Sequence, residues 1–225
     1  MKENAKKYYY SLQLEEIEKI KKLDHRPTLL MHTCCGICVS YPALYLSEYF
    51  DLTLFYCNDN IYPESEYEKR YNELVRLIDI FNSERSTAIS IIRKPYEGPA
   101  YLKKLEAFGP EKEGGARCSA CYSMRLDEGM KYAAENGYDY FTTVMTVSRQ
   151  KDSIRLNRIG EQLNKQFPAT RYFFSDFKKD GGNMKSDQIA NSYNVYRQNY
   201  CGCLYSLLEA RERESKHAER SGGEI

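Results

Sequence analysis

The sequence predicts an α/β fold built on a parallel β-sheet. Short apolar runs typical of buried strands alternate along the chain with longer segments that have helical periodicity. A strand, a helix and a second strand in succession form a parallel βαβ unit, and this order repeats here. The chain has 225 residues, enough for one such domain with a sizeable core.

Five runs predict the strands. The first lies between Pro27 and Gly36, and an apolar run of this length with such boundaries is typical of a buried strand. The other four predicted strands cover residues 51–57, 88–93, 138–147 and 170–174.

Helices are predicted between and around these strands. Residues 8–23 place leucine and isoleucine at nearly helical spacing among charged residues, which predicts an amphipathic helix leading into the domain. Pro63 followed by acidic residues is a good helix start, because carboxylates suit the positive N-terminal end. Asn136 and Gly137 form a natural helix end. The predicted helices after the first cover residues 39–50, 63–81, 124–135, 151–167, 184–193 and 204–220.

These elements predict one domain with a short extension at each end. Residues 1–27 contain the lead-in helix, residues 28–220 form a single domain, and residues 221–225 form a disordered tail. Two prolines and four glycines between residues 96 and 115 predict a loop with one short helix. Connections of this length are usually functional, and this one leads to Cys118.

Composition limits the classes of function. The chain has 33 basic and 32 acidic residues and a formal charge of +1, so any binding of nucleic acid requires a local patch. The N-terminus lacks the apolar core of a signal peptide, and no apolar stretch approaches the roughly 20 residues that span a bilayer. We therefore expect a cytoplasmic protein with no membrane partner. In that reducing compartment, eight cysteines favour metal ligation or redox chemistry over a disulfide framework.

Three cysteines follow the first predicted strand directly. Cys34, Cys35 and Cys38 fall in the loop where open α/β sheets place their chemistry, beyond the carboxyl ends of the strands. A lone free cysteine is a common core residue. A vicinal pair with a third cysteine one turn away is better explained as a functional site.

Cys118 and Cys121 have the spacing of metal knuckles and open a helix whose N-terminal amides favour thiolates. Together the two loops supply five candidate thiolates. A structural zinc site with four cysteines is one possibility. An iron-sulfur cubane is favoured, because adjacent cysteines are an awkward way to supply two corners of one small tetrahedron.

Cys201 and Cys203, separated by one glycine, form a different motif. Such a pair can close a small strained disulfide, which belongs to the labile, catalytic class and suits a two-electron relay. The alternative is that one or both ligate metal. Cys57, in the second strand, is interpreted as a packed core residue.

Six motifs occur together over residues 29–208. They are Cys34-Cys35-x-x-Cys38; Asn58-x-Asn60-Ile61-x-Pro63 with Glu66-Tyr67-Glu68; Arg117-Cys118-x-x-Cys121-Tyr122-x-x-Arg125-Leu126; Thr142-Thr143 with Ser148; Asp176-Phe177-Lys178-Lys179-x-Gly181-Gly182; and Tyr196-Arg197-Gln198-Asn199-Tyr200-Cys201-Gly202-Cys203. In this combination the chain resembles the QueH-type epoxyqueuosine reductases. It departs at Gly36 and Ile37, where Ala-Pro is usual, and at Asp59 and Tyr62, where proline and histidine are frequent. These departures concern local loop geometry.

The resemblance implies a reaction and a cofactor. The reaction is the removal of the epoxide oxygen of epoxyqueuosine at the wobble position of tRNA, which gives queuosine. The cofactor is a 4Fe-4S cluster, with an additional iron left open, and the resemblance places the cluster on Cys34, Cys35, Cys118 and Cys121. It treats Cys201 and Cys203 as redox-active and implies a Rossmann-like parallel sheet flanked by helices. The first loop has cysteines in place of a Ser-Gly-Gly phosphate loop, so ATP use is not expected.

Converting an epoxide to an alkene consumes two electrons and two protons. An accessible iron can bind the departing oxygen and pass single electrons, and a dithiol can store two. Asp176 and Tyr200 are the candidate proton donors, and Asp176 is alternatively an oxygen ligand to iron. An unidentified electron donor must restore the dithiol.

Residues 149–185 contain nine basic and four acidic residues, a local excess that predicts a docking surface for tRNA. The alternative is a solvated helix face. Two other classes of protein use similar cysteines: a zinc-stapled RNA-binding module, which iron analysis distinguishes, and an iron-sulfur tRNA thiolation enzyme, which needs a phosphate loop.

Overall fold

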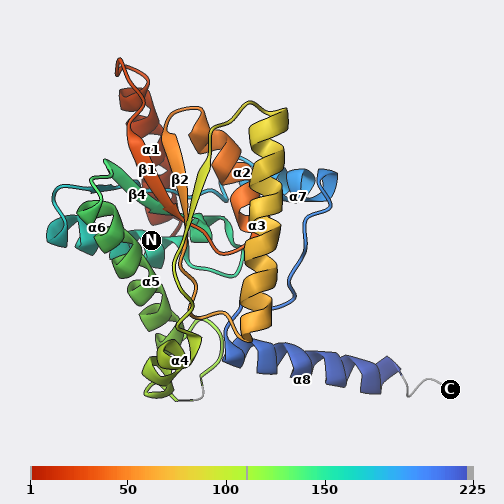
Figure 1. Cartoon of the computed structure of the whole chain (residues 1–225). Helices are drawn as coiled ribbons and strands as arrows, with labels where there is room; N and C mark the ends of the chain where they lie inside the picture. The colour runs from red at the N-terminus through yellow and green to blue at the C-terminus, as the bar shows by residue number, and fades with distance from the viewer. Residues whose placement is uncertain (1, 110, 222–225) are drawn as a thin grey trace.

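The structure is a computed structural model that describes residues 2–109 and 111–221 of the chain. Its centre is a five-stranded, all-parallel sheet in the order β3-β2-β1-β4-β5 (Figure 1). This confirms the predicted α/β fold with a parallel sheet. The strands are β1 (Thr28–His32), β2 (Asp51–Tyr56), β3 (Ser90–Arg93), β4 (Tyr140–Thr143) and β5 (Arg171–Tyr172).

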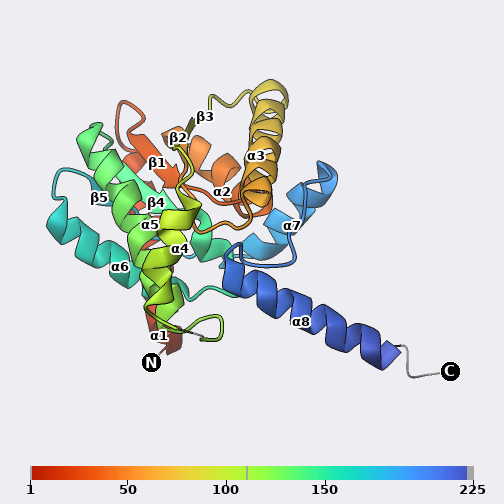
Figure 2. The same cartoon turned by 60° about the horizontal axis from the view of Figure 1, so that its bottom comes forward.

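Helices occupy every connection between strands and both ends of the described chain. Figures 1 and 2 show the last helix extending away from the body of the molecule. The helices are α1 (Lys2–Ile20), α2 (Gly36–Ser47), α3 (Glu64–Glu84), α4 (Gly98–Glu106), α5 (Ala116–Glu135), the 3-10 helix η1 (Val144–Val147), α6 (Ser153–Gln166), α7 (Gly182–Ser192) and α8 (Leu204–Ser221).

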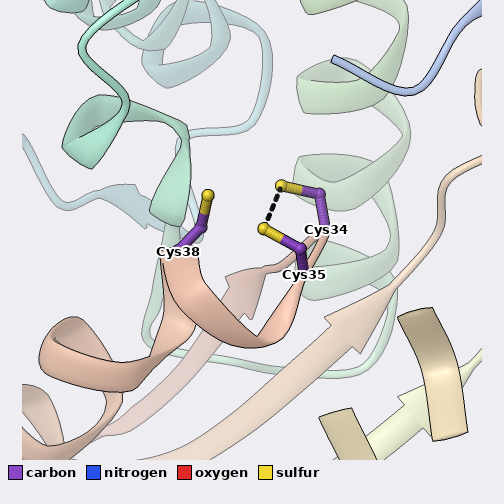
Figure 3. Close-up of side chains that lie close together, drawn as sticks. All are labelled: Cys34, Cys35 and Cys38. Carbon is purple, nitrogen blue, oxygen red and sulfur yellow. Dashed lines mark hydrogen bonds between the residues drawn. The ribbon is translucent and has the colours of Figure 1, made fainter. Parts of the chain in front are cut away.

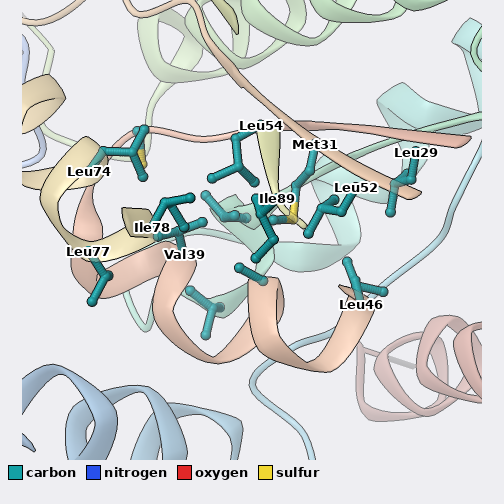
Figure 4. Packing of buried hydrophobic residues seen from close by; sticks show 14 of the residues in the cluster. Leu29, Met31, Val39, Leu46, Leu52, Leu54, Leu74, Leu77, Ile78 and Ile89 are labelled. Carbon is teal, nitrogen blue, oxygen red and sulfur yellow. The ribbon is translucent and has the colours of Figure 1, made fainter. Parts of the chain in front are cut away.

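The sheet is buried on both faces, as parallel sheets usually are. Successive residues of β1 enter different cores: Leu29 and Met31 pack with α2 and α3, as Figure 4 shows, whereas Leu30 packs with α5 and α6. This alternation follows from the two-residue period of a strand. All three side chains are fully buried, each worth about 1.5–3 kcal/mol of apolar transfer free energy.

The strand order places the end of β1 at the point where the connections change direction. β1 lies between β2 and β4, so chain segments leave it toward opposite halves of the sheet. In open α/β sheets a crevice forms outside the carboxyl ends of the strands at such a point. A hydrogen bond of 2.9 Å between His32 Nδ1 and Thr143 Oγ1 joins the ends of β1 and β4 there.

Some element boundaries differ from the sequence prediction. The strand predicted over 138–147 ends at Thr143, because the Thr143 side chain accepts the Met145 amide hydrogen and caps η1. α5 begins at Ala116, eight residues before the predicted start, so the C-x2-C motif lies inside its first turns. The short helix predicted within residues 96–115 is α4. Ser221 ends α8, and residues 222–225 of the predicted tail lie outside the described residues.

Candidate metal and redox centre

Cys34, Cys35 and Cys38 gather where β1 passes into α2. Their three sulfur atoms lie within 4.8 Å of one another, and the side chains point into one space (Figure 3). Cys34 and Cys35 are buried, with sulfurs 4.0 Å apart. Neither Cys118 nor Cys121 lies within 4.8 Å of all three sulfurs. Three soft donors this close form a candidate metal site.

The three thiols share their protons unequally. The pKa of Cys34 lies well below its usual value because Cys35 and Cys38 hydrogen-bond to its thiolate. The pKa of Cys35 is correspondingly raised, to about 12, by its hydrogen bond to Cys34, and that of Cys38 is raised as well. Because thiols bind metals as thiolates, binding a metal at this triad would release protons.

The Cys118 and Cys121 side chains come from the first turns of α5. Cys118 Sγ accepts the Gly114 amide hydrogen at 3.2 Å, yet burial raises the pKa of this thiol. Cys121 is buried, and the Tyr101 hydroxyl donates to its sulfur at 3.3 Å. Because Cys118 and Cys121 are three positions apart in α5, the two thiols lie on the same face of the helix.

Two buried cations lie among the thiols. Burial lowers the pKa of Arg125, but the charges of Cys121 and Cys34 outweigh it and raise that pKa. Burial likewise lowers the pKa of Lys151, and the charges of Cys201 and Cys34 raise it overall. Both cations thus face thiols from two separate loops. This positive charge can neutralise a cluster of thiolates, whose burial would otherwise be costly.

Cys201 and Cys203 lie in the segment that precedes α8. Both are partly exposed free thiols, and burial raises the pKa of Cys201 to about 11. Cys203 Sγ accepts the amide hydrogen of Ser206 at 3.4 Å, so it sits at the N-terminus of α8. Upstream in the same segment, Gln198 Nε2 donates to Cys35 Sγ at 3.1 Å. The segment therefore touches the first cysteine loop directly.

Asp176 is buried beyond β5, away from direct contact with the thiols. Its Oδ2 accepts from the Ser153 hydroxyl at 3.1 Å, its backbone amide donates to Gln13 Oε1, and its Oδ1 lacks a partner among the described residues. Burial raises the pKa of this carboxyl group. Tyr200, the other candidate proton donor, directs its hydroxyl to the backbone oxygen of Tyr62 at 2.6 Å.

A second group of possible metal donors lies outside this centre. Ligand atoms of Cys57, Asp59 and Glu128 are within 4.8 Å of one another, beside a cavity of about 420 Å³. Lys94 forms an ion pair with Glu128. Cys57 itself is buried in the core packed under α5, as expected from the sequence.

The sequence does not indicate that two cations are buried among the thiols, although Arg125 belongs to one of its motifs. Lys151 was counted in the basic surface segment, but only 8% of it is exposed and it faces Cys34 and Cys201. Arg155 of the same segment donates to Gly114 O and Ser119 Oγ at 2.9 and 2.8 Å, so it ties down the loop before Cys118. Charge counting cannot distinguish such inward-facing residues from exposed ones.

Among the residues described, no helix has both the length and the apolar character needed to cross a membrane.

The parallel sheet, the thiols at its switch point and the buried cations around them define a thiol-based α/β oxidoreductase. Comparison with known proteins identifies the family. The model of the family described as epoxyqueuosine reductase QueH matches residues 29–209. The chain therefore belongs to the QueH family of epoxyqueuosine reductases.

Curated relatives support the assignment over most of the chain. The Staphylococcus aureus epoxyqueuosine reductase QueH is 38% identical over 82% of this chain and 77% of its own length. The Streptococcus pyogenes serotype M1 protein of the same name is 34% identical over 89% of this chain and 78% of its own length. The Thermotoga maritima protein of the same name is 34% identical over 86% of this chain and 96% of its own length.

Proposed function

We propose that this chain reduces epoxyqueuosine to queuosine at the wobble position of tRNA. The observation that supports this most directly is the arrangement of cysteines: Gln198, five residues before Cys203, donates to the sulfur of Cys35. This contact supports placing the C-x-C pair beside the triad. Family membership supplies the reaction, and the site supplies thiols suited to it.

We assign a 4Fe-4S cluster to Cys34, Cys35, Cys118 and Cys121. The donor set fits this group: the thiols come from two loops, and buried Arg125 and Lys151 balance their charge. When bound, such a cluster supplies one-electron transfer and a Lewis-acidic iron. Cys38, next to the two triad ligands, is then free to hold an additional iron.

The electrons of the overall reaction balance through the dithiol. Epoxide and dithiol give alkene, disulfide and water: the two C–O bonds of the epoxide break, and the thiols of Cys201 and Cys203 lose two electrons and two protons as their S–S bond forms. An external two-electron donor then reduces the disulfide. Both thiols are free in the structure, the form that the reaction consumes.

Asp176 is the proposed proton donor to the departing oxygen. Its raised pKa, caused by burial, keeps more of the carboxyl protonated near neutrality than an exposed aspartate would be. Its Oδ1 has no protein partner among the described residues and is available for a proton or a ligand. The tRNA partner and a cytoplasmic location complete the proposal.

The deciding measurement is the iron and sulfide content of anaerobically prepared protein. Cys118→Ser should lower both and weaken the visible thiolate-to-iron absorption. Cys57→Ser removes a buried thiol from the same core against which Cys118 packs and is the matched control, compared by sulfide content and visible absorption. Full cluster loading in Cys118→Ser would contradict the ligand assignment, with Cys38 the next ligand to test.

Metal analysis also separates the rival functions. Zinc in place of iron, with no reductase turnover, would favour a zinc-stapled RNA-binding module. A thiolation enzyme would need a phosphate loop, and the loop after β1 holds Cys34 and Cys35 instead.

A further inference from the structure

We propose that Arg70 is the positioning residue of the 201–203 loop, holding the redox-active dithiol against the centre. This inference rests on the proposed function only for the catalytic meaning of the dithiol. The positioning itself is argued from contacts between α3 and the loop.

Arg70 is a buried cation in the second turn of α3. It is 1% exposed, and its Nε donates to Glu66 Oε1 at 2.8 Å, one turn earlier in the helix. A guanidinium presents five donors in a fixed planar fork. The bond to Glu66 uses the Nε hydrogen, so the two terminal nitrogens of the guanidinium remain free to donate to groups outside α3.

The free edge of the guanidinium reaches the backbone of the redox loop. Arg70 Nη1 donates to the carbonyl oxygen of Cys201 at 3.1 Å, and Nη2 approaches that of Tyr200 at 3.4 Å. The guanidinium also lies 5.1 Å from the centre of the Tyr200 ring. These contacts span 130 residues of sequence and are charge-assisted, hence stronger than neutral hydrogen bonds.

The loop is shaped to receive this cation. Gly202 has a φ of +135°, which side chains rarely adopt, and a Cβ there would lie 3.1 Å from Arg70 Nη1. The Gly202 carbonyl oxygen accepts the Tyr62 amide hydrogen at 2.8 Å. The backbone of the 201–203 loop is therefore held from two sides, and Arg70 is the side that carries a charge.

The same cation also faces the first cysteine loop. Burial lowers the pKa of Arg70, but the charges of Cys35 and Glu66 outweigh it and raise that pKa. Arg70 thus interacts electrostatically with Cys35 while it donates to the backbone oxygen of Cys201. By fixing the 201–203 loop, Arg70 sets the distance between the dithiol and the first cysteine loop. An arginine elsewhere on α3 would not have this effect.

The test measures thiol accessibility in the cluster-loaded, full-length protein. Arg70→Gln should speed alkylation of Cys201 and Cys203 by N-ethylmaleimide about tenfold or more, the factor expected for losing a charge-assisted hydrogen bond. Cys38 alkylation and iron content should stay unchanged. Turnover should fall in kcat with little change in KM. Arg70→Lys should fail to rescue, because an ammonium cannot reproduce the fork.

Two further variants keep the proposal testable if Arg70→Gln folds poorly. A Glu66→Gln, Arg70→Gln double variant avoids an uncompensated buried carboxylate. Gly202→Ala disrupts the contact between Arg70 and the 201–203 loop by changing the loop, and it leaves α3 unchanged. Each should release the dithiol in the same way.

Arg76→Gln is the matched control, since Arg76 also lies on α3 and pairs with a glutamate but does not touch the 201–203 loop. Wild-type alkylation rates in folded Arg70 variants, or an equal effect of Arg76→Gln, would overturn the proposal. Alkylation needs no substrate, so a lack of reductase activity in the wild type would count against the proposed function alone.

Discussion

At the scale of single residues, the centre combines thiols with buried cations. Arg125 and Lys151 each face sulfurs from separate loops. Cysteine spacing in the sequence indicated which thiols to consider, because metal and redox motifs depend on short separations. The burial of these cations could not be predicted, since it depends on contacts between segments far apart in the sequence: Arg125 donates to Asn58 from 67 positions away. Arg70, for example, reaches Cys201 from 131 positions away.

The dithiol prediction belongs to this scale. Cys203→Ser should retain its iron and its affinity for RNA but fail at multiple turnovers with a dithiol supply, because a C-x-C pair that has lost one sulfur cannot store two electrons. Cys57→Ser again serves as the control. After one turnover of wild-type protein, alkylation and peptide masses over residues 200–204 report the thiol state. Two free thiols alongside stoichiometric product, with no external reductant, would refute the relay.

At the scale of elements, the strands bring distant cysteines to one edge of the sheet. β1 ends two residues before Cys34, and α5 presents Cys118 and Cys121 in its opening turns. Alternating apolar runs predicted these strands and helices in the right order, because burial on both faces imposes that pattern. Boundaries were less predictable: η1 replaces the end of a predicted strand through a side-chain cap at Thr143.

Packing between α6 and β5 gives a prediction about stability. A Cβ at Gly160 would lie 2.3 Å from the ring of Tyr172, which is itself buried. Alanine favours helix by about 1 kcal/mol over glycine, but overpacking costs about 1–3 kcal/mol. Gly160→Ala should therefore lower the free energy of unfolding by up to about 2 kcal/mol.

Denaturant unfolding of the Gly160→Ala variant provides the measurement. Gln162→Ala, at an exposed position of the same helix, controls for helix propensity and should leave stability nearly unchanged. An increase in stability in Gly160→Ala would mean that Tyr172 has room to move, and that α6 is packed less tightly on β5 than the contacts indicate.

At the scale of the whole molecule, charge is balanced globally and uneven locally. The formal charge is +1, yet residues 149–185 contain nine basic and four acidic residues. The structure divides this segment between two roles. Lys151 and Arg155 face inward and support the centre, whereas Arg149 and Arg158 remain exposed. Only the exposed members are available to RNA phosphates.

The RNA prediction follows from this division. Replacing Arg149 and Arg158 together with glutamine should weaken tRNA binding and flatten its salt dependence, because each lost phosphate contact lowers the logarithmic slope by about 0.7 on single strands and about 0.9 on duplex. Iron content should not change, since neither side chain faces a thiol. Binding is measured by titration at several salt concentrations.

A control of equal charge separates docking from general electrostatics. Lys131 and Lys216 are exposed on α5 and α8, outside the basic segment, and their double replacement with glutamine removes the same charge. If the basic segment docks the RNA, the first pair changes the slope and the control pair leaves it nearly intact, because screened charges beyond about 10 Å contribute little at 0.1 M salt. Equal effects of the two pairs would place the RNA elsewhere, and α8, which projects from the body (Figure 2), would become the surface to test.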